Sequence, residues 1–112
     1  MPSVGEKVMA KTTERVLGLG VMRVLAEQPN GEATVRTLIR RVPNFVRLTD
    51  EDRETSETRP PEEMWEQRVR NLKSHDTTAG NVIGEGFVEH VGRGRYRLTA
   101  AGRLHLSHKG LI

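Results

Sequence analysis

The spacing of apolar residues changes once along this 112-residue chain, from a helical period to the alternation that is typical of strands. Three apolar stripes with a period of about 3.6 residues come first. They are Leu17, Val21, Val24 and Leu25; then Val35, Leu38, Ile39 and Val42; then Trp65, Val69 and Leu72. Two alternating segments follow, residues 87–91 and 95–99, and Gly92-Arg93-Gly94 joins them. Glycines there can adopt the positive φ angles of a tight turn, so the pattern predicts three helices followed by a β-hairpin.

Capping residues and helix breakers set the expected ends of these helices. Pro29-Asn30-Gly31 is expected to end the first helix near Glu27, and Pro43 is expected to end the second. Gly18 and Gly20 weaken the first helix by about 1 kcal/mol each relative to Ala, which indicates that another element packs closely against it. The expected N-terminal caps or first residues are Thr12 or Thr13, Thr34, Pro61 and, for a short last helix, Thr99.

The order of these elements predicts a mainly α fold with a small β-hairpin, of the winged helix-turn-helix type. A chain of 112 residues is long enough for one compact domain and too short for two. We expect residues 12–108 to form this domain, residues 1–11 to be a flexible lead-in, and residues 109–112 to be a frayed tail. Residues 55–61, which are polar and include two prolines, are expected to form an exposed loop.

Charge is distributed unevenly along the chain, although the net charge is only +3. Residues 1–49 hold eight Lys and Arg against four Asp and Glu, a balance of +4. Residues 50–66 hold two against eight, a balance of −6, and residues 67–112 hold eight against three, a balance of +5. Two basic regions flank an acidic block, and one of them contains the glycine-rich hairpin, which favours a polyanionic partner.

The side of the third predicted helix that lies opposite its apolar stripe carries side chains that can read DNA bases. This side holds Gln67, Arg70, Asn71 and Ser74, with Lys73 and His75 on its flanks. Side-chain amides pair bidentately with adenine, and guanidinium groups pair bidentately with guanine. The helix is therefore a candidate recognition helix, and the alternative is an ordinary solvated helix face.

The predicted hairpin carries three arginines within five residues. Arg93 lies at its tip, and Arg95 and Arg97 lie on the side of the return strand opposite Tyr96 and Leu98. Arginines in such positions contact phosphates or enter a narrow minor groove. The alternative is that they protect the strand edge from pairing with other molecules. The hairpin and the third helix together predict double-stranded DNA as the partner.

Three arginines of the second predicted helix are less decisive. Arg36, Arg40 and Arg41 lie largely outside its apolar stripe. They can contact phosphates as the helix crosses a DNA backbone, or they can form an ordinary solvated surface.

The sequence shows no arrangement of residues that supports catalysis. It has no cysteine, which excludes disulfides, thiolate metal sites and cysteine nucleophiles, and which fits a reducing cytoplasm. His105 and His108 are three residues apart, but no carboxylate or cysteine lies near them in the sequence to complete a metal site. No apolar stretch is long enough to cross a bilayer. We therefore expect a cytoplasmic protein that is not an enzyme and has no cofactor, metal or membrane contact.

Four segments are similar, in their order and spacing, to those of a known family. They are residues 21–26, 48–54 and 65–72 and, most specifically, Gly94-Arg95-Tyr96-Arg97-Leu98-Thr99-Ala100-Ala101-Gly102-Arg103. Over about residues 16–106 the chain resembles the N-terminal winged-helix domain of Mrr-type restriction proteins and related winged helices of restriction nucleases. The chain departs from that family in a longer link between Ser74 and Gly86, and it has no PD-(D/E)xK or HNH nuclease motif.

The resemblance implies a recognition helix with Gln67, Arg70, Asn71 and Ser74, and a wing with Arg93 and Arg95. It also implies a target-recognition domain, with modified bases among its candidate targets. A nuclease domain in a longer protein or in a partner chain would then cut the DNA.

Two alternatives stay open. One is a winged helix that serves protein interaction or homodimerisation through residues 50–66 and the glycine-bearing first helix. The other is a stand-alone transcription regulator, which the sequence does not distinguish from the target-recognition domain of a restriction-type nuclease.

Overall fold

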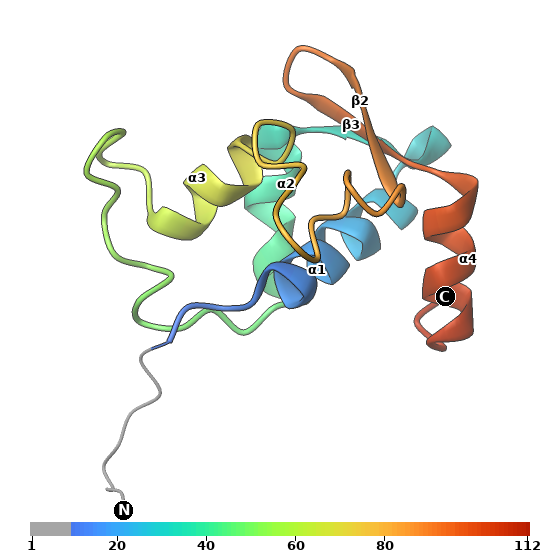
Figure 1. The fold of residues 1–112 in the computed structure, drawn as a ribbon, viewed down its shortest axis with the longest axis horizontal. Helices are drawn as coiled ribbons and strands as arrows, with labels where there is room; N and C mark the ends of the chain where they lie inside the picture. Colours follow the sequence, from blue (N-terminus) through green and yellow to red (C-terminus); the bar gives the residue numbers. More distant parts are fainter. Residues whose placement is uncertain (1–9) are drawn as a thin grey trace, which may run out of the picture.

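Helix α1, Glu14–Ala26, runs through the centre of the structure, and most of the other elements pack against it (Figure 1). The computed structural model describes residues 10–112, so residues 1–9 of the expected lead-in lie outside the described residues. In the described part, four α-helices accompany a three-stranded antiparallel sheet. The predicted order of three helices, a hairpin and a last helix is confirmed.

Threonine caps begin three of the four helices, as the sequence predicts. Thr13 caps α1, Thr34 caps α2 (Val35–Arg41), and Thr99 caps α4 (Ala100–His108). Each hydroxyl accepts a hydrogen bond from the backbone N–H three residues ahead, at 3.0–3.2 Å. The prediction that Pro43 ends the second helix is also confirmed, because the chain passes there into the short 3₁₀ turn Val42–Asn44.

Helix α3 is shorter than the sequence predicts. It spans Met64–Arg70, so it begins three residues after Pro61 and ends before Asn71. Glu63 and Glu66 form a capping box at its start, in which the Glu63 backbone N–H donates to the Glu66 carboxylate at 2.8 Å. Residues 42–63 separate α2 from α3, so the two helices are not joined by a tight turn.

The predicted hairpin is present and gains a third strand. Strands β2 (Val88–Gly92) and β3 (Arg95–Leu98) form the hairpin, and β1 (Glu32–Thr34) pairs with the other edge of β3. The sheet order is therefore β1-β3-β2. Of the two turn glycines only Gly94, with a φ of 65°, adopts the expected left-handed conformation.

The core consists of the apolar stripes that the sequence shows. All apolar-stripe residues predicted for the first and third helices are buried. Those of the second helix are also buried, except Ile39, which is half-buried. Tyr96 and Leu98 add the inner face of β3, and Leu106 adds α4. These side chains form one continuous cluster between the helices and the sheet.

Gly18 and Gly20 allow two loops to pack directly against α1, as predicted. A Cβ atom added to Gly18 would lie 2.4 Å from Val82 Cγ1, and one added to Gly20 would lie 2.3 Å from Val46 Cγ2. Both distances are far below van der Waals contact, so any side chain at these positions would displace the packed valine.

The expected fraying after the last helix is wrong. The Leu111 N–H donates to the Leu106 carbonyl at 2.9 Å, and the Gly110 N–H donates to the Ser107 carbonyl at 2.9 Å. This pair of bonds is a Schellman motif, and Gly110 has the positive φ (71°) that the motif requires. Leu111 packs against the core, which anchors the end of the chain.

No helix within residues 10–112 combines the length and the apolar character that crossing a membrane requires.

Candidate nucleic-acid interface

The end of α3 meets the hairpin at Tyr96, a buried residue in the middle of β3. The Tyr96 side chain lies close to the backbone of Lys73 and to the charge of Arg70. Burial raises the pKa of Tyr96, and these two interactions oppose that rise only in part. The residues that follow α3 are therefore held beside the hairpin (Figure 1).

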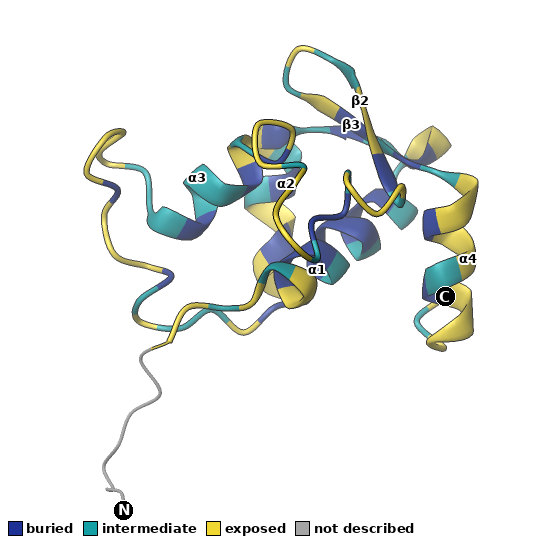
Figure 2. Cartoon of the chain, viewed as in Figure 1, coloured by how far each residue is buried: buried dark blue, intermediate teal, exposed yellow. Residues whose placement is uncertain are grey.

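The predicted base-reading residues lie around the C-terminal end of α3 rather than along a full helix. Asn71 is the C-cap residue, with φ −99° and ψ 18°, and Lys73, Ser74 and His75 lie in the turns that follow. The prediction that they sit on the helix is wrong, because the continuous helix ends at Arg70 and the chain after it forms turns. Lys73, Ser74 and His75 are nevertheless exposed, and much of the segment between α3 and β2 is exposed with them (Figure 2).

Gln67 is one of the predicted reading residues that already have a partner in the chain. Its side-chain oxygen accepts a hydrogen bond from the hydroxyl of Ser56, which is itself buried. The loop before α3 therefore covers this part of the helix face. The sequence reading missed the contact because periodicity identifies the face opposite the core and does not show whether another segment packs on it.

Arg70 is exposed but paired. Its Nε and Nη2 atoms donate to Glu62 Oε2 at 3.0 and 2.7 Å. The hydrogen bond to Glu62 raises the pKa of the guanidinium, so Arg70 stays charged. Two of the guanidinium donors that could pair with guanine are thus occupied by a carboxylate of the same chain.

Lys73 also has a partner, which is the nearby Asp76. Lys73 Nζ lies 3.0 Å from Asp76 Oδ2, and more than half of the lysine side chain is exposed. Exposed pairs of this kind contribute about 0–1 kcal/mol to stability, so Lys73 can exchange this partner for a phosphate.

Arg95 and Arg97 lie on the outer face of the sheet, opposite Tyr96 and Leu98, as predicted. They are not free cations there. Arg97 faces Glu32 on β1 and Glu89 on β2, with Nη1 3.6 Å from Glu32 Oε1 and Nε 3.3 Å from Glu89 Oε2. Arg95 Nε lies 3.0 Å from Glu32 Oε2. Two arginines and two glutamates leave this face without net charge, so its arginines stabilise strand pairing.

Arg93, in contrast, is exposed at the tip of the hairpin, and no described residue forms an ion pair with it. The turn that presents it is fixed to α2, because the Val35 N–H donates to the Gly94 carbonyl at 2.9 Å. Arg36, Arg40 and Arg41 are exposed along α2, which begins at this contact. Within the described part of the chain, the uncompensated positive charge near the hairpin therefore belongs to Arg93 and α2.

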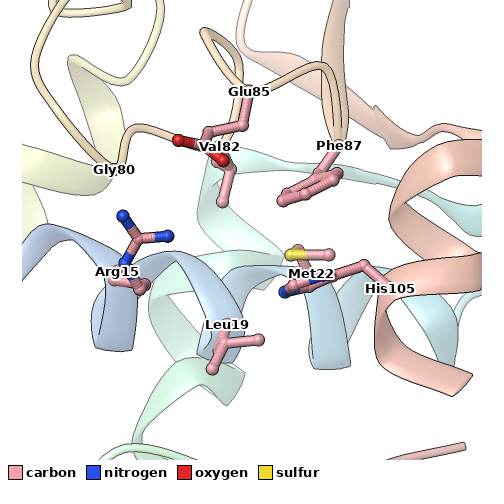
Figure 3. A pocket seen from close by; sticks show the side chains of 8 residues that line it. All are labelled: Arg15, Leu19, Met22, Gly80, Val82, Glu85, Phe87 and His105. Carbon is pink, nitrogen blue, oxygen red and sulfur yellow. The ribbon is translucent and has the colours of Figure 1, made fainter. Parts of the chain in front are cut away.

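The histidines of α4 do not form a metal site with other residues of the described chain. Among residues 10–112, no group of three or more His, Cys, Asp or Glu side chains is arranged to hold an ion. The ring of His105 instead stacks on Phe87, with centroids 4.3 Å apart. The cavity beside them has a volume of about 10 Å³, which is the minimum for a single water molecule (Figure 3).

Asp52, Arg68 and Glu14 form a polar network that the sequence reading missed. Arg68 donates to the Thr12 carbonyl at 2.7 Å and to Glu14 at 3.1 Å, and it lies 3.7 Å from the buried Asp52 carboxylate. This network fixes α3 against the start of α1 and the loop before α3. Residues 50–66 contain many acidic residues, and nothing in the neighbouring sequence indicates that Asp52 is the one that becomes buried.

Comparisons of this chain with protein-family models, with curated proteins and with solved structures find no match.

Proposed function

We propose that this chain is a non-catalytic module that binds double-stranded DNA, with a winged helix-turn-helix fold. The observation that carries the proposal is the contact of Tyr96 with the backbone of Lys73. This contact brings the segment that follows α3, which carries the exposed Lys73, Ser74 and His75, beside strand β3 of the Arg93-tipped hairpin. A helix end and a hairpin on the same side of a small domain can contact the major groove and the adjacent backbone together.

Each exposed group has a distinct role in this proposal. Asn71 and Ser74 face base edges, and Arg70 joins them once it leaves Glu62. Lys73, His75 and Arg93 contact phosphates and fix the register of the domain on the duplex. Arg95 and Arg97 have a smaller role than the sequence predicts, because the sheet glutamates already neutralise them.

The element order supports the winged-helix assignment, since three helices precede a two-stranded hairpin that a further strand extends. The long segment between α2 and α3 sets the chain apart from a simple helix-turn-helix. On the family resemblance alone, we further propose that the module recognises targets, modified bases among them, for a restriction-type nuclease. Its cytoplasmic location and its lack of catalysis stay predictions.

Selection of bound duplexes from a random pool, with and without adenine and cytosine methylation, tests this function. We expect enriched sequences and a binding constant that falls with salt by about 0.9 log units per log unit for each phosphate contacted. The variant Asn71→Ala should lose about 1–3 kcal/mol of preference at one base pair. Its control is Asn44→Ala, an exposed asparagine outside the proposed interface. Absence of duplex binding at low salt contradicts the proposal.

The second candidate function is protein interaction or homodimerisation. It is favoured by the neutral outer face of the sheet, where Arg95 and Arg97 are already paired with glutamates. Sedimentation would then show a stable dimer or partner complex, and Arg93→Ala would leave it unchanged.

A further inference from the structure

Residues 54–63, here called the α3 cover, fold back on themselves immediately before α3. The Ser56 N–H donates to the Glu62 carbonyl and the Met64 N–H donates to the Glu54 carbonyl, both at 2.8 Å. An isolated β-bridge pairs Thr55 with Glu63 between these two bonds. The cover is therefore a defined loop whose base is attached to the start of α3, while residues 57–61 at its tip are exposed.

The α3 cover holds the two longest side chains of the predicted reading face. Ser56 donates to the amide oxygen of Gln67, and Glu62 accepts both donors from one edge of Arg70. These are the groups that would hydrogen-bond to adenine and guanine. While the cover is closed, the Nε–Nη2 edge of Arg70 cannot pair with a base, because the same two donors cannot serve both partners.

Within residues 10–112, the closed cover leaves one buried polar atom without a hydrogen bond. Glu62 Oε1 is buried and has no hydrogen-bond partner within the described chain. A buried acceptor without a donor raises the free energy of the state that contains it. The other oxygen binds Arg70 at a partly exposed site, where solvent weakens the ion pair. These features lower the free-energy difference between the closed cover and an open one.

Charge adds a reason for the cover to move when a polyanion approaches. Residues 54–63 contain four glutamates and one arginine, a balance of −3, and they lie within the acidic block of residues 50–66. DNA phosphates repel this segment and attract the arginine that it holds. Duplex DNA and the cover thus compete for the same face of α3.

We propose that the α3 cover is an autoinhibitory element that closes over Gln67 and Arg70 and must be displaced before α3 reads base edges. This proposal rests on the DNA-binding function proposed above. The cover imitates the duplex by offering a carboxylate to Arg70 and a hydroxyl to Gln67. The free protein consequently binds DNA more weakly than its exposed side chains alone would permit.

The variant Glu62→Gln tests the proposal, because it removes the charge that holds Arg70 and nearly preserves the shape of the side chain. Affinity is measured by fluorescence anisotropy with a labelled duplex of random sequence at low salt. We expect Glu62→Gln to bind at least about fivefold more tightly, the lower end of typical coupling between linked equilibria. The matched control is Glu57→Gln, which removes the same charge from the exposed tip of the cover. In an Arg70→Ala background, Glu62→Gln should raise duplex affinity no more than Glu57→Gln does.

A disulfide lock provides a second test that does not depend on weakening the loop. The chain has no cysteine, so the double variant Thr55→Cys with Glu63→Cys places two thiols on facing residues of the β-bridge that closes the base of the cover. The oxidised protein should bind the same duplex at least about fivefold more weakly than its reduced form, since the cover then cannot leave Arg70.

The outcomes separate this proposal from the DNA-binding proposal. Equal gains for Glu62→Gln and Glu57→Gln, or equal binding by the oxidised and reduced double variant, overturn the autoinhibitory role and leave duplex binding intact. If neither the original chain nor any variant binds duplex, the DNA-binding proposal fails and the role of the cover fails with it.

Discussion

Asp52 accepts two hydrogen bonds from Thr12, one from its backbone N–H at 2.9 Å and one from its hydroxyl at 2.6 Å. The two residues are forty positions apart, and only 1% of Asp52 is exposed. Thr49 donates its backbone N–H to the same carboxylate at 2.9 Å. The contact joins the start of α1 to the segment before α3, so it fixes the position from which the α3 cover extends.

The first prediction concerns acid stability. Burial alone would raise the pKa of Asp52, but the hydrogen bonds from Thr12 and Thr49 outweigh it and lower the pKa below its ordinary value. A carboxyl whose pKa is lower in the folded state stabilises the fold above its unfolded pKa, and that stability is lost as pH falls through the folded pKa. We therefore expect the free energy of unfolding from urea titrations to decline below about pH 4.

The variant Asp52→Asn isolates this contribution from that of the other carboxylates. The amide NH₂ of Asn would face one of the N–H or O–H donors. We therefore expect the free energy of unfolding to fall by about 3 kcal/mol at neutral pH. Its unfolding free energy should then change less between pH 6 and pH 3 than that of the original chain. A parallel decline in both proteins would show that Asp52 does not carry the acid sensitivity.

The second prediction tests the close packing at Gly18. Alanine favours a helix over glycine by about 1 kcal/mol, but its Cβ would lie 2.4 Å from Val82. Overpacking of a filled core costs about 1–3 kcal/mol, so Gly18→Ala should destabilise the fold despite the gain in helicity. Thermal and urea unfolding measure the change. In a Val82→Ala background, where the blocking methyl groups are absent, Gly18→Ala should instead be neutral or stabilising.

Local features of the fold could be predicted from the sequence, because their causes lie within a few residues. Thr13, Thr34 and Thr99 cap helices through bonds to residues three positions ahead, and Tyr96 alternates with its neighbours on one strand. The buried stripes follow from the same local geometry. Strand β1 could not be predicted, since it has three residues and its pairing depends on a strand more than sixty residues away.

The candidate site was predictable only in part, for the same reason. Arg70, residues 73–75 and Arg93 are exposed as expected, but the partners of Gln67 and Arg70 lie in a loop expected to be open to solvent. A proline-containing polar loop leaves no periodic pattern that shows where it packs. The pairing of Arg97 with two glutamates likewise needs the register of three strands, which is a long-range property.

The third prediction separates the arginines of the hairpin by function. Arg93→Ala should weaken binding to all duplexes alike and lower the salt slope by about 0.9, as expected for one lost phosphate contact. Arg97→Ala should change the salt slope much less, because Glu32 and Glu89 already neutralise that charge. Anisotropy titrations at several salt concentrations measure both.

A control for these variants removes a positive charge elsewhere. Lys109 follows α4, at the end of that helix farthest from the hairpin tip (Figure 1). Lys109→Ala should leave the salt slope unchanged. A loss equal to that of Arg93→Ala would mean that net charge, and not the position of the hairpin tip, determines affinity.

The fourth prediction tests the contact that holds α3 beside the hairpin. Tyr96→Phe keeps the buried ring and removes the oxygen that lies beside the Lys73 backbone, so the fold should lose at most about 1 kcal/mol. Tyr96 is 2% exposed and cannot touch DNA itself. Duplex affinity should nevertheless fall more than the small stability loss explains, since the segment after α3 is no longer fixed to β3. The comparison is with Gly18→Ala, which lowers stability at a distance from this contact. If both variants bind duplex equally well at a temperature where each is fully folded, the placement of α3 beside the hairpin does not determine binding.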